Sequence, residues 1–360
     1  MELSELVREI ESAHDPAAQA RIERSRSTVM RGIAQPHPRR SRRRWVWGGT
    51  AAGTMVAGAI AAAVIIAGTV SPLAAPPASA AAVAVLNDAA GAAMTSPDPV
   101  LAPGQYLRMR ETYDLITLWD ADLDPSDPVF GFSAAALDQS EGAVFQRSIR
   151  DLYVPSDRAG DWIIDDRQVN EVRDVFGDPA TLPAFEAMVA EVGDRDADPG
   201  GLVALPGGIA KEGESWEPFR DEYATMPRDP EKLLEWFRER LAAYGDDDWI
   251  IFQNIGHFLS TDLMPAELRA ATLHTVALLS GVEVARTDGS VTTLRMESHL
   301  DEGSEFGDLL VSEIDINTES GHIVGGREVY PHRPTDLLPA ELPWVSWTVD
   351  FEIVDEAPQP

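Results

Sequence analysis

The sequence predicts an α+β protein in three parts: an N-terminal cytoplasmic arm, one transmembrane helix, and an extracytoplasmic domain with a curved antiparallel sheet and packed helices. The first observation is the charge. The 360-residue chain has a net charge of −31, but residues 1–44 hold ten Arg and six acidic residues, a net of +4. The second is that Trp45 to Asn87 contains no charged side chain. The third is apolar–polar alternation near the C-terminus, which is typical of a sheet covered on one side.

The basic arm, residues 1–44, is too short to bury a core of its own. Leu3, Leu6, Val7 and Ile10 recur at helical spacing, which predicts a short amphipathic helix. Two uses stay open for the arm: docking on a soluble partner, or resting on the membrane surface as a solvated tether.

The apolar stretch of residues 45–70 is the predicted transmembrane helix. As a helix its 26 residues reach about 39 Å, enough to cross a hydrocarbon core of roughly 30 Å. A basic and aromatic flank marks its cytoplasmic end and consists of Arg39, Arg40, Arg42, Arg43, Arg44, Trp45 and Trp47. The positive-inside rule then places the arm in the cytoplasm and the acidic remainder outside.

A cleaved signal peptide is the alternative, because Ala78-Ser79-Ala80 has the form of a cleavage site that ends after Ala80. The basic leader and the apolar run are both longer than is usual for a signal peptide, which favours the uncleaved anchor. A Pro- and Ala-rich linker, residues 71–78, follows the span and predicts a stiff spacer.

The predicted extracytoplasmic domain is residues 79–354, with a disordered tail at 355–360. Ser79 predicts the N-cap of a helix that ends near Met94, and Asp229-Pro230 predicts another cap. Residues 166–219 are rich in Gly, Pro and Asp and predict loops with one short helix over 183–192. The other expected strands and helices are 105–118, 145–154 with 162–164, 230–241, 249–259 and a helix from Pro265 to Gly281 with Leu268, Leu278 and Leu279 inward.

The last quarter of the chain gives the clearest strand pattern. Strands over 282–286 and 291–296 flank Asp288-Gly289, a two-residue hairpin signal. Two further strands, 309–316 and 323–329, precede a final one in which Val345, Trp347, Val349, Phe351 and Ile353 alternate with polar residues. This pattern predicts an antiparallel sheet with one apolar face.

The chain resembles an uncharacterised family of single-pass membrane proteins of high-GC Gram-positive bacteria, often encoded beside extracytoplasmic-function sigma factors. The resemblance covers the whole plan, including the Arg-rich flank and the Ala-rich span. The other stretches that carry it are 78–80 through 85–87, 103–106, 226–230, 265–271 and 279–282.

In element order the outer domain is also similar to the half-barrels of periplasmic lipoprotein carriers (LolA-like domains) and of sigma-regulating sensors. In those proteins a curved antiparallel sheet and a leading helix enclose an apolar cavity. The likeness implies binding of an acyl chain or a protein rather than bond making.

Motifs for chemistry are scarce. The seven histidines lack the spacing of a zinc site, and the absence of cysteine excludes thiolate sites, so we expect no cofactor. Asp120, Asp122 and Asp124 match positions 1, 3 and 5 of a calcium loop. Pro125 and Gly131 stand where that loop needs its turn glycine and its bidentate Glu, so the match is incomplete.

The sequence therefore predicts a membrane-anchored envelope protein with a non-catalytic outer domain that binds a ligand or partner. The expected partners are the lipid bilayer, a lipid or an envelope protein, and a sigma factor or other cytoplasmic regulator bound through residues 1–44. The acidic charge argues against nucleic acid. An alternative is an anchored hydrolase of cell-wall or lipid substrates, suggested by the many acidic and aromatic residues.

Overall fold

The computed structural model describes most of the chain from Pro77 onward, and the predicted arm, span and most of the linker lie outside the described residues. The described residues are 77–96, 98–123, 128–133, 135–165, 167, 171–195, 201–209, 222–245, 247–260, 263–300, 304, 306–333 and 335–359.

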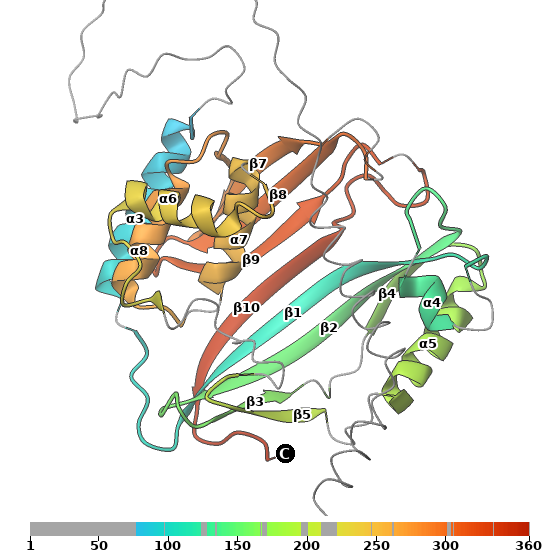
Figure 1. Cartoon of the computed structure of the whole chain (residues 1–360), viewed down its shortest axis with the longest axis horizontal. Coiled ribbons are helices and arrows are strands. Elements are labelled where there is room, and N and C mark those ends of the chain that lie inside the picture. The colour runs from blue at the N-terminus through green and yellow to red at the C-terminus, as the bar shows by residue number, and fades with distance from the viewer. Residues whose placement is uncertain are drawn as a thin grey trace, which may run out of the picture.

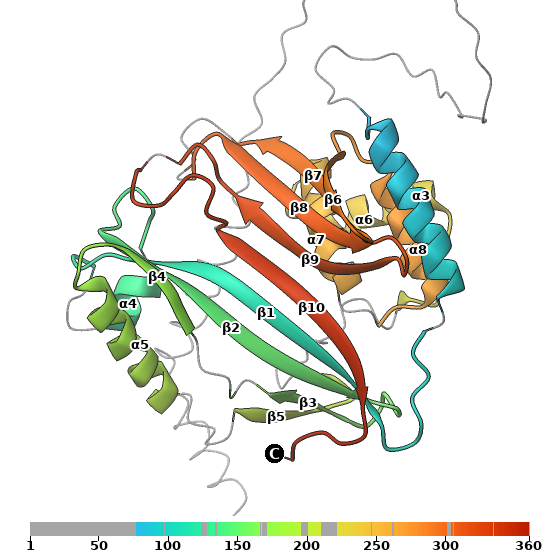
Figure 2. The same ribbon diagram turned by 180° about the vertical axis from the view of Figure 1, so that it is seen from behind.

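One antiparallel sheet forms the centre of this part (Figures 1 and 2). Its strand order is β5-β3-β2-β1-β10-β9-β8-β7-β6, and β4 pairs with β2 beside β3. The longest strands, β1 and β2, pair over their whole length, so the middle of the sheet is continuous. The strands are β1 (Tyr106–Trp119), β2 (Gly142–Pro155), β3 (Asp161–Asp165), β4 (Glu171–Gly177), β5 (Leu202–Pro206), β6 (Glu283–Asp288), β7 (Val291–His299), β8 (Leu309–Asn317), β9 (His322–Val329) and β10 (Val345–Val354).

The helices fall into two groups. Helices α6, α7 and α8 lie in front of β7–β9 in Figure 1 and behind them in Figure 2, and α3 packs against α8. Helices α4 and α5 pack together at the far end of β1 and β2. The helices are α3 (Ala80–Thr95), α4 (Pro128–Ser133), α5 (Thr181–Arg195), α6 (Pro230–Leu241), α7 (Asp248–Ser260) and α8 (Ala266–Val276).

Strand register divides the sheet into two faces. On one, the helix face, Met109 of β1 lies opposite Leu152 of β2 and Phe351 of β10, and these side chains belong to the main core with α3 and α6–α8. On the other, the open face, Arg110 lies opposite Asp151 and Asp350. The alternation expected for the last strand is confirmed in its middle, where Trp347 and Val349 are buried on the helix face while Thr348 and Asp350 are exposed on the open face. It fails at the end of the strand, where Ile353 is 44% exposed.

Capping residues set two helix starts as expected. Ser79 Oγ accepts a hydrogen bond from Ala82 N at 3.2 Å, and Asp229 Oδ1 accepts one from Lys232 N at 3.1 Å, so each satisfies a backbone donor of the first turn. Pro230 occupies the first helical position of α6, where a missing N–H costs no hydrogen bond.

The predicted fold class is wrong as stated, because it included a helix that crosses the membrane. Among the described residues no helix is both long and apolar enough to span a bilayer. The structure shows a mostly antiparallel sheet with helices. The space that a half-barrel would leave empty is also filled at one end, since α6, α7 and α8 bring buried apolar side chains onto the helix face.

Three local expectations are also wrong. The 166–219 region contains, besides the expected helix, two strands, β4 and β5, which pair with β2 and β3. Leu278 is 43% exposed because α8 ends at Val276 and the following turn directs Leu279 inward instead. The β6–β7 turn is shifted by one residue: Asp288 pairs with Val291, so Gly289, with φ of +58°, and the next residue form the turn.

The part of the predicted tail that the structure describes packs on the domain. Gln105 Nε2 donates to Asp355 Oδ1 at 2.9 Å, and Ala357 is buried.

Candidate functional site

The open face carries a row of arginine–carboxylate pairs across its central strands. Arg110 on β1 donates to both carboxylate oxygens of Asp151 on β2, through Nε at 2.8 Å and Nη2 at 2.7 Å. Four residues further along β1, Asp114 accepts the same two-fold contact from Arg147 on β2, at 2.7 Å for each bond. The paired donors match the planar geometry of a carboxylate, so these guanidinium groups are held in one orientation.

A second cluster lies on the same face over β6, β8 and β9. Glu313, of which 6% is exposed, accepts from Arg327 Nε at 2.8 Å and Arg286 Nη1 at 2.9 Å. Arg286 also reaches Asp315 at 3.2 Å. Burial acts to raise the pKa of Glu313, but the hydrogen bonds and charges of the two arginines outweigh it and hold that pKa below its ordinary value.

Electrostatics on this face differ from those of the domain as a whole. The sequence after Asn87 holds 19 basic and 54 acidic residues, a net of −35. The open face, in contrast, joins six arginines to six carboxylates in ion pairs, so it carries both signs of charge, with Asp350 and Glu283 as further carboxylates at its strand positions. The paired residues are Arg108 with Glu352, Arg110 with Asp151, Arg147 with Asp114, Arg286 and Arg327 with Glu313 and Asp315, and Arg295 with Glu297.

The basic side chains of these pairs are all arginine, as are 27 of the 29 basic residues of the chain, so the choice of arginine reflects the composition. The rigid guanidinium makes several hydrogen bonds at a small loss of freedom, which holds each pair in a defined geometry. Their side chains are about a quarter to a half exposed, for example 27% for Arg108 and 49% for Arg286. The open face is thus a wide, ordered and accessible polar surface.

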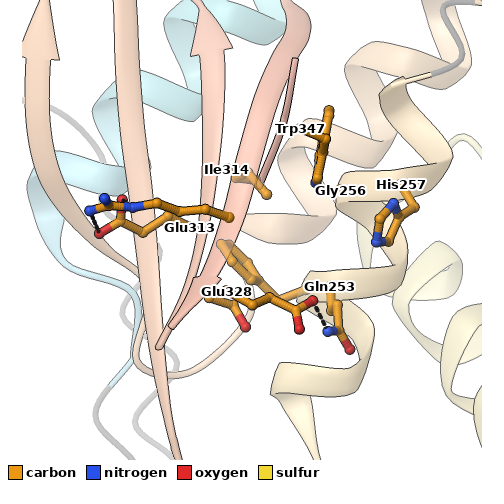
Figure 3. A pocket seen from close by; sticks show the side chains of 10 residues that line it. Gln253, Gly256, His257, Glu313, Ile314, Glu328 and Trp347 are labelled. Carbon is orange, nitrogen blue, oxygen red and sulfur yellow. Dashed lines mark hydrogen bonds and ion pairs between the residues drawn. The ribbon is translucent and has the colours of Figure 1, made fainter. Parts of the chain in front are cut away.

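A small cavity lies on the helix face, where α7 meets β8, β9 and β10 (Figure 3). Gln253 Nε2 donates to Glu328 Oε1, and burial raises the pKa of Glu328 while that hydrogen bond partly opposes the shift. The His257 ring stacks on Trp347 with centroids 5.6 Å apart, and loss of solvation lowers the pKa of His257 although its outer side meets solvent. Figure 3 shows Glu313 directed to the opposite side of the sheet.

Ser312 contributes a polar group to this cavity. It is opposite Glu328 in the strand register, and its buried Oγ has no hydrogen-bond partner in the described part of the chain. The cavity measures about 10 Å³, which is room for about one water molecule. A water there would complete the bonding of Ser312, but a substrate ring does not fit.

The predicted calcium ligands are only partly described. Asp122 N donates to Asp120 Oδ1 at 2.9 Å, a local turn contact, and Asp124 lies outside the described residues. In the described ranges no group of three or more acidic or histidine side chains is arranged to hold a metal ion. The predicted membrane flank, Arg39 to Trp47, also lies outside them.

Sequence reasoning missed the arginine–carboxylate rows. Arg110 and Asp151 are 41 residues apart, and Arg108 and Glu352 are 244 apart, so only the strand register brings them together. The available signal was the alternation of charged residues along 106–114 and 147–151, which places them on one side of each strand.

Comparison with known protein families, curated proteins and solved structures finds no significant match for this chain.

Proposed function

We propose that the described α+β domain is a non-catalytic binding domain of the cell envelope, and that its open face binds a protein partner. The observation that carries this proposal is the row of arginine–carboxylate pairs, with both signs of charge, on a strongly acidic domain. The extracytoplasmic location is a prediction from the charge distribution of the sequence.

Preorganisation is the physical reason for this choice. A long side chain that becomes fixed on binding costs about 0.5–1.5 kcal/mol. Arg110 and Arg147 are already fixed by two bonds each to a carboxylate, so a partner meets donors whose order is established before binding. Each guanidinium has five N–H donors, and these contacts use only some of them.

Charge also favours a protein over a polyanion or an acidic membrane surface. The large negative excess of the domain repels anionic polymers and lipids, whereas a face with both signs of charge matches a protein surface of alternating charge. The open face is therefore suited to a partner with a mixed polar surface, and its pattern of pairs sets the register of binding.

The hydrolase alternative lacks a comparable feature. Glu328 and His257 line a common cavity, but its volume of about 10 Å³ excludes a sugar ring or an acyl chain. We therefore do not favour hydrolysis as the activity of the described part.

Binding of a sigma factor or other regulator through residues 1–44 stays a prediction from the sequence, because that arm lies outside the described residues. Co-purification with the tagged arm tests it, and failure to recover a regulator would contradict it.

Site-specific photo-crosslinking in cells tests the open-face proposal. A photoreactive residue replaces Thr348, which is exposed on β10, and in a matched control it replaces Glu235 on α6. We expect one discrete crosslinked partner from position 348 and none of that size from position 235. Equal crosslinking from both positions would overturn the proposal.

Exchanging the two charges of one ion pair tests recognition by the open face without removing the contact between the strands. The double variant Arg108→Glu with Glu352→Arg keeps an ion pair between β1 and β10 but reverses its direction. We expect the crosslink from position 348 to fall severalfold while the unfolding midpoint changes little. An unchanged crosslink in the swap variant would contradict recognition by this face.

A further inference from the structure

A groove lies at one end of the open face, between β4 and the loop that joins β9 to β10. Its volume is about 540 Å³, within the range of ligand pockets. Phe176 forms one wall and lies opposite Ala143, which pairs in turn with Leu118 on the open face. The residues that line the groove are Phe176, Pro331, Arg333, Thr335, Asp336, Leu337, Leu338, Pro339 and Ala340.

Arg333 differs from the arginines of the open face because its hydrogen-bond partners are neutral. Its Nη1 donates to the Pro339 carbonyl at 2.8 Å, its Nη2 donates to the Leu342 carbonyl, and its buried Nε has no hydrogen-bond partner among the described residues. No described carboxylate forms an ion pair with it. Burial lowers the pKa of Arg333, and the charges of Tyr330 and Glu341, which form no ion pair with it, oppose this shift only in part.

The rest of the groove is well ordered and partly apolar. Leu338 is 4% exposed and packs with Ile116 and Leu118 under the loop, and Leu337 is half-buried beside them. Leu337 N donates to Thr335 Oγ1 at 3.2 Å, which fixes the turn. An apolar side chain entering the groove therefore meets Phe176 and the leucines, while a polar group beside it meets Arg333.

We infer that this groove binds a carboxylate that stands next to an aliphatic side chain in the protein partner. This inference rests on the proposed function and names the chemistry of one anchor. Each Nη atom of Arg333 has two hydrogens and uses one of them in a bond to a backbone carbonyl, so one hydrogen on each Nη stays free to donate. A carboxylate can accept both of these hydrogen bonds at once. Such a carboxylate also places a negative charge in direct contact with the guanidinium, closer than that of Glu341. Asp336 is exposed at the rim and disfavours a ligand with more than one negative charge.

Short peptides titrated into the purified full-length chain test the inference. The probes are acetyl-Gly-Gly-Leu with a free C-terminal carboxylate, the same peptide as its amide, and acetyl-Gly-Leu-Asp-Gly amide. We expect the free acid or the Asp peptide to bind about tenfold tighter than the amide, the gain typical of hydrogen bonds to a charged group. Preference between the two acids identifies a chain terminus or an internal acidic residue as the anchor.

Variants assign the binding to the groove. Arg333→Ala removes the preference for the acid, and Phe176→Ala weakens acid and amide alike, whereas Arg238→Ala on α6, outside the open face, has no effect. Equal binding of acid and amide, or no binding of any peptide, would overturn the inference. The inference would also be overturned if Arg333→Ala folds and binds the peptides as tightly as the wild-type chain does. If that variant does not fold, the comparison of acid with amide in the wild-type chain still tests the inference.

The two proposals fail separately. The Arg108→Glu, Glu352→Arg swap should leave peptide binding unchanged, because that pair lies near the opposite end of β1. If the peptides fail but the crosslink from position 348 persists, only the groove is refuted. If the peptides bind but the crosslink is absent, the partner surface is refuted and the groove stands as a carboxylate site.

Discussion

Glu313 joins three strands of the open face, and its removal tests whether the arginine pairs stabilise the sheet. The carboxylate is 6% exposed and accepts from Arg327 at 2.8 and 3.1 Å and from Arg286 at 2.9 Å. Glu313→Gln keeps the shape of the side chain, removes the charge, and leaves Arg327 without its paired carboxylate and Arg286 with Asp315 alone.

The expected loss of unfolding free energy depends on how deeply Glu313 and its two arginine partners are buried. Removing one partner of a fully buried ion pair costs about 3–5 kcal/mol, whereas exposed pairs contribute about 0–1 kcal/mol. The Arg286 and Arg327 side chains are 49% and 39% exposed, so water takes over part of the lost bonding. We expect Glu313→Gln to lower the free energy of unfolding by about 1–2 kcal/mol.

Urea unfolding of the purified chain measures the effect, with Glu297→Gln as the matched control. Glu297 lies on the same face, but its side chain is 49% exposed and pairs with Arg295 on its own strand. The control should lose less than about 0.5 kcal/mol. If the two variants lose the same free energy, burial of Glu313 under its arginines is not what stabilises this region.

The pH dependence of the stability difference between wild type and Glu313→Gln tests the direction of the pKa shift independently. Because the folded state holds the pKa of Glu313 below its ordinary value of 4.5, its stabilising effect is complete above that value. The effect is lost as the pH falls through the lower, folded-state pKa. The difference between wild type and Glu313→Gln should thus be constant near neutral pH and close in acid. A difference that grows in acid would refute the reasoning.

Four further substitutions have defined outcomes. Burial raises the pKa of Glu328, so ionisation of this carboxyl disfavours the folded state once the pH rises above the ordinary pKa of a glutamate. Glu328→Gln should therefore increase the free energy of unfolding at neutral pH and lose that gain in acid. Urea unfolding at several pH values measures the difference. Gly326→Ala places a Cβ 2.7 Å from a backbone oxygen and should lower the free energy of unfolding by about 1–3 kcal/mol. Gly91 on α3 has no atom within 4 Å of an added Cβ, so Gly91→Ala should raise the free energy of unfolding by about 0.5–1 kcal/mol in the same assay. Asp229→Ala removes the α6 cap and should cost about 1 kcal/mol, and no change in thermal unfolding would contradict the capping role.

Local sequence signals were sufficient to predict those features that depend on one strand or one helix turn alone. The alternation of apolar and polar residues in the middle of β10 sets which side of the strand is buried at Trp347 and Val349. The Asp229-Pro230 pair likewise starts α6, since both a cap and a proline act within one turn.

Other features depend on neighbours that the sequence does not reveal. β4 and β5 are short and largely exposed, and they are strands because β2 and β3 offer them hydrogen-bonding edges. The register that sets Arg110 against Asp151 results from pairing along the whole of β1 and β2. The groove at Arg333 needs a loop and a strand that are far apart in the chain.

The central claim is that the open face recognises a protein partner. The most direct measurement is the yield of the photo-crosslinked partner from position 348 in the wild-type chain and in the Arg108→Glu, Glu352→Arg swap, with unfolding midpoints measured in parallel. We predict one partner whose yield falls severalfold in the swap while the midpoint holds. Equal yields in the two proteins, or no crosslink in either, would contradict the claim.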